Sequence, residues 1–383
     1  MSTSRISVGY DISVNFFSRS GIARYSRELL RQMQTYSDVD TSLVGYKRQR
    51  DEVAEFFGGV LPGNASLSLT HERALGAPLR RLTRLWIQRE LRRLFDGVDV
   101  VHYLGPQKIF ADHKRTISTV HDLIPMFNEF SADAGLRYRF PRMVEKQLRH
   151  SNAVVCPSQW VADTIRDRFD WFRGPITVTP LAAGPQFSPS PLTDDVRRKY
   201  DLHRRYVLFV GRIDVARKNI DRMIEAWMSM PMQNRKDTDF IIITDRNDRV
   251  IKSFVSGLPR CDASVRIVNT VSNAELTQFL SSASMLLFAS QAEGFGLPIL
   301  EAMQCGCPVI TSSTTSMTEV GGDAVLYVDP TSVEQIRETI AGALHDQDLL
   351  ADLKERGLVQ CSKFRWERTA ELTLGAYRSC PTR

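Results

Sequence analysis

The sequence lacks the patterns that would assign it to several common classes of protein. No uninterrupted apolar run approaches the roughly 18 residues that a membrane span needs. The first eight residues contain no apolar segment of the kind found in signal peptides, so none is expected. The six cysteines show neither a Cys-x-x-Cys spacing nor the density of a disulfide framework. We therefore expect reduced thiols in a cytoplasmic protein.

The composition is that of a globular protein with more than one domain. The 383 residues exceed what one hydrophobic core usually holds, and 43% are hydrophobic and 25% charged. Residues 180–191 contain four prolines and a glycine, a linker composition. The boundary is therefore predicted between a first domain, residues 1–185, and a second, residues 186–364.

The net charge of +6 is unevenly distributed between these two parts of the chain. Residues 1–185 hold 26 Lys and Arg against 19 Asp and Glu, whereas residues 186–383 hold 24 against 25. A basic first half suits an anionic partner such as a membrane surface, a phosphorylated lipid or nucleic acid. Solubility alone explains the same excess equally well.

The stretch Glu293–Glu301 carries the clearest local signal, with two carboxylates eight positions apart around a glycine-rich turn. The apolar run Met285–Phe288 before it predicts a buried strand. A helix is predicted over Leu297–Gln304, with Pro298 in its first turn. A strand, a glycine turn and a helix N-terminus direct N–H groups and the positive end of the helix dipole to one point, which suits a phosphate. A turn with two solvated glutamates is the alternative.

Polar residues also follow predicted strands in the first half. Ile6–Asp11 predicts a first strand, and Gly21 opens the next helix, where a backbone can approach a ligand closely. His121 follows the apolar run Thr116–Val120. Because ligands of parallel α/β sheets bind off the carboxyl ends of strands, Gly21 and His121 are candidate site residues. A structural role is the alternative for a lone histidine.

The second half offers two cations in a similar place. A strand is predicted over Tyr206–Arg212, and Lys218 precedes a helix predicted over Ile220–Met230. Arg212 and Lys218 thus bracket a loop at the carboxyl end of a strand, where a planar guanidinium and a compact ammonium could hold a diphosphate. Taken alone, such basic residues are more often surface charges.

Together these segments resemble the retaining GT-B glycosyltransferases of the family 4 type. Glu293–Glu301 is similar to their Glu-x7-Glu motif, and Gly211–Asn219 to their Gly-Arg…Lys-Asn stretch. Residues 21–25 resemble the Gly-Ile-Gly-Arg-Tyr loop of the mannosyltransferase-like branch, with Ala23 in place of its second glycine. His121-Asp122 resembles the segment that these enzymes place against the donor sugar.

The resemblance implies an α/β fold of two Rossmann-like parallel-sheet domains facing a central cleft, with a last helix, residues 365–383, crossing back to the first domain. It implies that Glu301 binds the ribose, that Glu293 lies near the transferred sugar and that His121 contacts that sugar. The catalytic residues it implies are His121, Arg212, Lys218 and Glu293. The donor-binding residues it implies are Gly21, Arg212, Lys218, Val271, Glu293, Gly294, Phe295, Gly296, Leu297 and Glu301.

The implied activity is transfer of a sugar with retention of configuration. The donor favoured by the resemblance is GDP-mannose, and the acceptor is a lipid-linked saccharide of polysaccharide or lipopolysaccharide synthesis; a UDP-sugar carrying glucose or N-acetylglucosamine is the alternative donor. No cofactor other than the nucleotide sugar and no metal is expected, because Arg212 and Lys218 would meet the phosphate charge. The one Asp-x-Asp pair, Asp38 and Asp40, lies in a polar loop and is interpreted as surface. The loop Thr244–Asp248 departs from the glycine usual in the family, which leaves its contact with the nucleotide open.

An arginine-rich helix is predicted over Pro78–Phe95, with six arginines interleaved with leucines and aromatic residues. Such a helix suits the interface of an anionic membrane, which would place the protein at the inner face of the cell membrane. The alternative is a peripheral helix that packs its leucine face on the sheet and leaves its arginines in water.

Three other functions fit parts of the sequence. A nucleotide-sugar 2-epimerase shares the fold but is not expected to carry the Glu-x7-Glu turn. A nucleotide-dependent dehydrogenase needs a Gly-x-Gly-x-x-Gly that is absent. A nonenzymatic binder of nucleic acid or anionic membrane fits the charge but leaves the second-half motif unexplained, so no nucleic-acid partner is expected.

Overall fold

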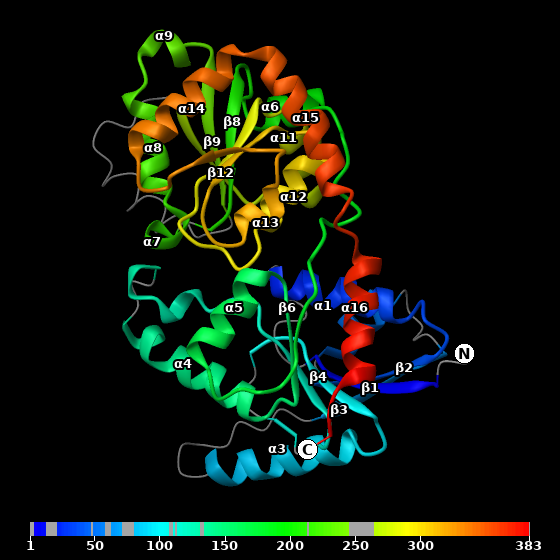
Figure 1. Ribbon diagram of the computed structural model, residues 1–383. Coiled ribbons are helices and arrows are strands. Elements are labelled where there is room, and N and C mark those ends of the chain that lie inside the picture. Colours follow the sequence, from blue (N-terminus) through cyan, green and yellow to red (C-terminus); the bar gives the residue numbers. More distant parts are fainter. Residues whose placement is uncertain are drawn as a thin grey trace. The chain divides into compact units, whose positions relative to one another are not determined.

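The chain forms two compact units, each built on one parallel sheet (Figure 1). The computed structural model describes residues 4–12, 21–46, 49–57, 63–70, 80–106, 110–111, 113–130, 134–212, 214–244 and 264–382. Within these ranges, the first unit holds residues 4–126, 134–181 and 366–382, and the second holds residues 127–130 and 182–365. The chain leaves the first unit at Leu181, inside the linker-like stretch 180–191.

The first unit has a seven-stranded sheet in the order β3-β2-β1-β4-β5-β6-β7, with every neighbouring pair parallel. Its elements are β1 (Ile6–Asp11), α1 (Gly21–Met33), β2 (Val39–Tyr46), α2 (Arg50–Phe56), β3 (Ala65–Thr70), α3 (Arg80–Leu94), β4 (Val100–Tyr103), β5 (Thr116–Thr119), η3 (Ile124–Met126), α4 (Ala134–Arg149), β6 (Ala153–Cys156), α5 (Gln159–Arg168), β7 (Ile176–Val178) and α16 (Trp366–Ser379). Parallel neighbours require crossovers, and α1, α2, α3, α4 and α5 supply those between β1 and β2, β2 and β3, β3 and β4, β5 and β6, and β6 and β7.

The second unit has a six-stranded sheet in the order β10-β9-β8-β11-β12-β13, again wholly parallel. Its elements are η4 (Asn128–Phe130), α6 (Asp194–Lys199), β8 (Arg205–Val210), α7 (Val215–Lys218), α8 (Ile220–Ser229), α9 (Met232–Arg235), β9 (Thr238–Thr244), β10 (Val265–Asn269), α11 (Asn273–Ser282), β11 (Met285–Phe288), α12 (Leu297–Gln304), β12 (Val309–Ser312), α13 (Met317–Gly321), β13 (Leu326–Val328), α14 (Val333–His345) and α15 (Gln347–Cys361). Two parallel α/β sheets confirm the predicted fold class. In the described part of the chain, no helix is long and apolar enough to cross a membrane.

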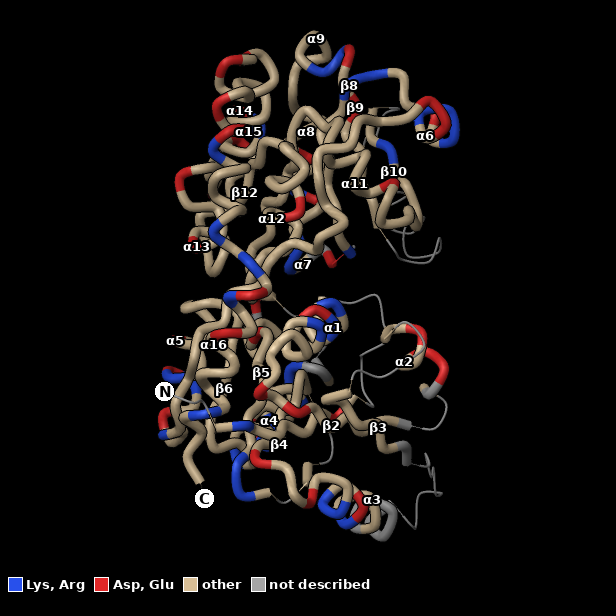
Figure 2. The backbone as a smooth tube through the Cα atoms, turned by 90° about the vertical axis from the view of Figure 1, so that its right-hand side faces the viewer, with Lys and Arg blue, Asp and Glu red and all other residues tan. Residues whose placement is uncertain are grey.

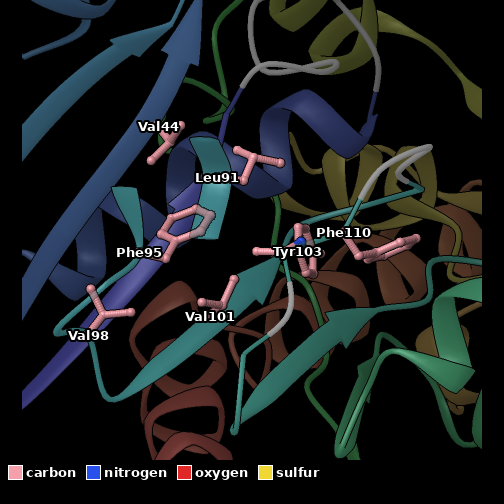
Figure 3. Close-up of a cluster of buried hydrophobic side chains, with 8 residues drawn as sticks. Val44, Leu91, Phe95, Val98, Val101, Tyr103 and Phe110 are labelled. Atoms are coloured by element: carbon pink, nitrogen blue, oxygen red, sulfur yellow. The ribbon is translucent and has the colours of Figure 1, made fainter. Parts of the chain in front are cut away.

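Strand β4 shows how the first sheet divides its contacts between two helices. Side chains alternate along a strand, so Val101 and Tyr103 lie on one face and His102 lies on the other. Val101 and Tyr103 join the apolar cluster beneath α3, to which the helix contributes Leu91 and Phe95 (Figure 3). His102 instead contacts α16. A four-residue strand therefore holds helices from two distant parts of the chain.

Gly9 of β1 explains how closely α3 approaches the sheet. A Cβ at this position would lie 2.5 Å from Cδ1 of Phe95, well inside contact distance. The Phe95 ring, which is fully buried, occupies the space that a side chain at this position would need. A larger residue at this position would push the ring off the strand, because protein interiors hold little free space.

The same packing decides between the two interpretations of the arginine-rich helix. Leu91 and Phe95 are buried against the sheet, and Ile87 and Leu94 are partly buried beside them. Apolar surface covered in this way cannot enter a bilayer, so Leu91 and Phe95 do not anchor the helix in a membrane. Arg89, Arg92 and Arg93 of the helix are exposed, and Figure 2 shows basic positions along α3. Pro78 and Leu79 lie outside the described residues.

Helix α16 returns from the C-terminal end of the chain to the first sheet and lies beside α1 (Figure 1). Arg115 contacts the end of the helix: its Nε donates to the Cys380 carbonyl over 3.0 Å and its Nη2 to the Tyr377 carbonyl over 2.6 Å. Arg378 pairs with Asp38 over 2.5 Å. A guanidinium at the C-terminal end of a helix both satisfies carbonyls and complements the dipole.

A buried chain of hydrogen bonds connects α16 to three strands. The hydroxyl of Tyr377 lies 3.1 Å from that of Tyr10 and 2.6 Å from Nδ1 of His102. Nε2 of the same imidazole lies 2.8 Å from Oγ1 of Thr119, which lies 2.9 Å from the hydroxyl of Tyr25. All five side chains are almost wholly buried. Because buried polar groups are costly when unpaired, each member of this chain depends on the others.

We expect Tyr377→Phe to lower the free energy of unfolding of the first unit by about 1–3 kcal/mol, because it leaves one nitrogen of His102 buried without a partner. Urea unfolding measures this change. Tyr138→Phe is the matched control, since Tyr138 is 64% exposed and should stay within about 0.5 kcal/mol of the wild type. Equal stability of the Tyr377→Phe variant and the wild type would contradict the role given to this hydroxyl.

Candidate functional site

Each sheet reverses its strand order at one place, and the candidate residues gather there. In the second unit β8 lies between β9 and β11, and in the first unit β1 lies between β2 and β4. The loops after β8 and β11, and after β1 and β4, therefore diverge at a topological switch point, where open α/β sheets bind ligands. Lys218 and Glu293 follow β8 and β11, whereas Gly21 follows β1.

The loop after β8 is held by Asn219, the N-cap of α8. This residue is fully buried and left-handed, with φ 57°, a conformation that asparagine tolerates better than most residues. Its Nδ2 donates to the carbonyls of Ala289 over 3.0 Å and of Pro330 over 2.6 Å. The amide thereby ties the β8 loop to the loops after β11 and β13. Lys218, directly before it, is placed by the same anchor.

The turn after β11 is fixed from the loop after β12. The backbone N–H of Glu293 donates to Oγ1 of Thr315 over 3.1 Å. The hydroxyl of Ser316 lies 2.8 Å from the Glu293 carbonyl and 3.0 Å from that of Phe295. Gly296 then caps α12 with φ 108°, a conformation that side chains rarely adopt. The glycine turn predicted from the sequence is thus a defined structure that presents Glu293.

Lys218 and Glu293 form a buried ion pair in the second unit. Nζ of Lys218 lies 2.5 Å from Oε1 of Glu293, and both residues are 7% exposed. The ammonium also lies 4.6 Å from the centre of the Phe288 ring, whose face attracts a cation. The pair joins two loops that are 75 residues apart in the sequence. The structure therefore brings together two of the residues that the resemblance singles out.

A third charge completes this group. Nη1 of Arg217 lies 3.3 Å from Oε2 of Glu293, and its Nε lies 3.4 Å from Oδ2 of Asp214. Sequence reasoning missed Arg217, although its position next to Lys218 in a basic Arg-Lys pair was a signal. On α7 the two successive side chains reach the two oxygens of one carboxylate.

The electrostatics of the group follow from burial and charge. Burial disfavours the charged form of Glu293, but Lys218 and Arg217 outweigh it and hold the pKa of the carboxyl below its usual value. Burial lowers the pKa of the Lys218 ammonium despite the attraction of Glu293. Taking two charges out of water costs several kcal/mol per ion, so the pair is weak evidence for stability and stronger evidence for a site.

The other candidate residues of the second unit are spread along the same edge of the sheet. Glu301 lies about one turn into α12 and is buried. Arg212 lies after β8 and is exposed, whereas Val271 lies between β10 and the capped start of α11. Gly294, Phe295 and Gly296 are buried, and Leu297 is half-buried. Asp245–Asp248, where the sequence departs from the family pattern, lie outside the described residues.

In the first unit, Gly105 brings the two remaining candidates close together. A Cβ on Gly105 would lie 3.2 Å from Ile22, the residue after Gly21, and 3.9 Å from the ring of His121. His121 also packs edge-on against Tyr25 of α1, with ring centres 4.9 Å apart. The start of α1 and the residues after β5 thus converge at the switch point. Residues 13–20, which precede Gly21, lie outside the described residues.

The hydrogen bond of His121 assigns its tautomer. Nε2 lies 2.8 Å from the carbonyl oxygen of Leu104, which can only accept, so this nitrogen carries the proton. Burial lowers the pKa of His121 to about 4, so the ring is neutral near pH 7. Nδ1 is then the basic nitrogen and can accept a hydrogen bond from a hydroxyl. A sugar hydroxyl is a ligand that this arrangement suits.

The carboxylates of the Asp-x-Asp pair have other partners. Asp40 pairs with Arg5 over 2.5 Å, and Asp38 pairs with Arg378 over the same distance. The two side chains are therefore engaged in separate ion pairs at the surface of the first unit. The prediction of a loop is wrong for Asp40, which lies in β2, but both side chains are half-exposed, in agreement with their interpretation as surface residues.

The lowered pKa of His121 has a consequence for stability. Between about pH 6.5 and pH 4 an unfolded chain binds a proton on this residue that the folded chain does not. The stability contributed by neutral, half-buried His121 is therefore complete above pH 6.5 and is lost as pH falls towards 4. We expect His121→Gln to flatten the fall of the melting temperature over this window. The exposed His203 is the control, and His203→Gln should leave the profile unchanged; identical profiles for His121→Gln and the wild type would show that His121 contributes nothing to the fall.

Comparison with family models divides the chain at the same linker. The model of Glycosyltransferase Family 4 matches residues 19–183, and the model of Glycosyl transferases group 1 matches residues 193–359. Gly21 and His121 lie in the first match, whereas Lys218 and Glu293 lie in the second. The two matches lie on different sheets.

Individual proteins show the same relationship. O-antigen chain mannosyltransferase B of Escherichia coli is 29% identical over 376 residues, which are 94% of this chain and 96% of that protein. Among solved structures, WaaG, a glycosyltransferase involved in lipopolysaccharide biosynthesis, has a TM-score of 0.68 at 17% identity and covers 97% of this chain and 100% of its own. Anabaena HepE, solved with UDP and glucose, has a TM-score of 0.71 at 14% identity, with 98% and 100% covered. The chain is thus a glycosyltransferase of the GT-B type, built from a Family 4 domain and a group 1 domain.

Proposed function

We propose that this glycosyltransferase transfers mannose from GDP-mannose to a lipid-linked saccharide acceptor in the synthesis of a polysaccharide or lipopolysaccharide. The observation that carries the proposal is the likeness to an O-antigen chain mannosyltransferase over 94% of the chain. That likeness extends over both units of the chain.

The chemistry proposed for the second unit is stabilisation of a leaving diphosphate. Breaking the bond between the anomeric carbon and the diphosphate develops negative charge on the phosphate and positive charge on the sugar. Lys218, on α7 after β8, and Arg212 in the same loop supply the positive charges. The helix N-terminus that follows Gly296 adds a dipole directed at the same edge of the sheet. These groups would meet the phosphate charge without a metal ion.

In this proposal, Glu293 and His121 contact the transferred sugar. An ionised Glu293, whose pKa is held down by two cations, orients the sugar and stabilises positive charge on it. His121 is neutral and offers Nδ1 to a sugar hydroxyl, and Glu301 binds the ribose of the donor. The acceptor hydroxyl attacks from the face that the diphosphate leaves, and a phosphate oxygen accepts its proton. The configuration at the anomeric carbon is then retained.

A UDP-sugar is the alternative donor. HepE, which shares the fold, was solved with UDP and glucose. Phosphate and sugar contacts are the same in both cases, so the alternative changes the donor and leaves the mechanism as proposed.

Contact with an anionic membrane at the cytoplasmic face would bring the enzyme to such an acceptor. Because Leu91 and Phe95 pack on the sheet, this contact would be electrostatic and use the exposed Arg89, Arg92 and Arg93 of α3. Basic residues near an anionic surface each contribute about 1 kcal/mol.

Loss of either diphosphate cation should reduce turnover strongly. We expect Arg212→Ala and Lys218→Ala each to lower the rate by about 100-fold or more, the scale for removing one group that stabilises developing charge. GDP released from GDP-mannose, with a detergent extract of lipid-linked saccharides as acceptor, measures this rate. Lys218→Ala also leaves Glu293 buried without its nearest cation, so circular dichroism must show that the variant is folded. Near-normal rates in both variants would reject the diphosphate assignment.

Thermal shift with a panel of nucleotides tests the donor. GDP and GDP-mannose should raise the melting temperature more than UDP, ADP, dTDP or their sugars, since a ligand stabilises the state that binds it. EDTA should leave the shift unchanged if protein cations alone hold the diphosphate. A selective response to UDP would move the donor to the alternative, and no response to any nucleotide would oppose the proposed function itself.

A further inference from the structure

Glu293 has its two oxygens held by two different cations, and the proposed function employs only one of them. Oε1 is held by Lys218 over 2.5 Å, and Oε2 by Arg217 over 3.3 Å. Lys218 is assigned to the diphosphate, which leaves Arg217 without a part in the reaction. A role for Arg217 therefore rests on that proposed function.

Donor binding creates a competition for Lys218. A diphosphate carries more negative charge than a carboxylate, so its arrival draws the ammonium away from Oε1. Glu293 would then be a buried carboxylate without its nearest cation, and burial favours its neutral form. A protonated Glu293 could not stabilise positive charge on the sugar. A second cation that remains in place would prevent this.

We propose that Arg217 is a positioning residue that keeps Glu293 in place while Lys218 turns to the diphosphate of the donor. The two residues are neighbours on α7, but their side chains are attached differently. Lys218 contacts the carboxylate through one flexible chain that ends in a rotatable ammonium. Arg217 is held at its side chain and at its backbone.

The backbone contact ties Arg217 to the segment that carries Glu293. The N–H of Gln291, two residues before Glu293, donates to the Arg217 carbonyl over 2.8 Å. On the other side, Nε of Arg217 lies 3.4 Å from Oδ2 of Asp214. Arg217 is also 25% exposed at its side chain, so its charge is less costly to retain than that of buried Lys218. The hydrogen bond to Gln291 thus holds the Arg217 backbone beside the loop that carries Glu293.

The charges around Glu293 support these separate roles for Arg217 and Lys218. Lys218 and Arg217 both lower the pKa of its carboxyl group. Asp214 contacts Arg217 and, by its charge, favours the protonated form of Lys218. With Lys218 engaged by phosphate, Arg217 is the remaining cation of this cluster on the carboxylate. Its removal raises the pKa of Glu293. Protonation then begins at a higher pH, and turnover should be lost on the acid side earlier than in the wild type.

Arg217→Gln tests the proposal through two measurements on the full chain. Turnover of GDP-mannose should fall by about 10- to 100-fold, on the scale of a misplaced reacting group. The dissociation constant of GDP, measured by calorimetry, should stay within about threefold of the wild type, because ΔG changes little when the phosphate contacts remain. The acid limb of the rate profile between pH 5 and 8 should move to higher pH. Arg217→Lys should recover part of the rate and return the limb towards its wild-type position.

Arg337→Gln is the matched control, because Arg337 also lies 3.3 Å from each of two carboxylates, Glu334 and Glu338, on α14. It should leave the rate, the GDP affinity and the pH profile unchanged. In a Glu293→Gln background, Arg217→Gln should cause little further loss, since the carboxylate on which it acts is gone.

The outcomes separate this inference from the proposed function. If Arg217→Gln weakens GDP binding more than tenfold, Arg217 holds the donor itself and the positioning role is overturned. If the rate falls without movement of the acid limb, the residue is structural and the inference is again overturned. Wild-type behaviour of Arg217→Gln, beside a large loss in Lys218→Ala, rejects the inference and leaves the proposed function standing. Wild-type behaviour of both variants removes the diphosphate assignment on which both depend.

Discussion

The buried contact between Lys218 and Glu293 is the interaction on which the candidate site depends. It places two opposite charges 2.5 Å apart in a unit whose other buried residues are mostly apolar. Such a pair survives only when the surrounding backbone fixes both partners. Asn219 does this for the loop after β8, and Ser316 and Gly296 do it for the turn after β11. Much of the local architecture of the second unit therefore serves the geometry of one carboxylate and one ammonium.

The first unit solves a different problem, because its histidine must stay neutral. His121 is kept so by burial, with its one proton directed to the Leu104 carbonyl. Its ring packs against Tyr25, whose hydroxyl belongs to the hydrogen-bond chain that ends on α16. The C-terminal helix is thus part of the structure around His121, although it is more than 200 residues away in the sequence.

Local sequence signals predicted the elements of the fold well. The strand Met285–Phe288 and the helix Leu297–Gln304 have the predicted bounds, because an apolar run, a glycine turn and an early proline act within a few residues. The two parallel sheets were implied by the family resemblance, and the structure confirms them. The arginine-rich helix was ambiguous for a physical reason. Its leucine face suits a membrane or a sheet equally, and only the space left by Gly9 and filled by Phe95 decides between them.

The sequence by itself determined which residue types follow which strands, and therefore that glycines, cations and carboxylates lie at the carboxyl edges of two parallel sheets. The tertiary structure alone decided which of these groups touch. Arg217 meets Glu293 across 76 residues of sequence, and His121 loses its charge because of neighbours from separate elements. Secondary structure depends on interactions within a few residues, whereas ion pairing and burial depend on the packing of segments that the sequence keeps far apart.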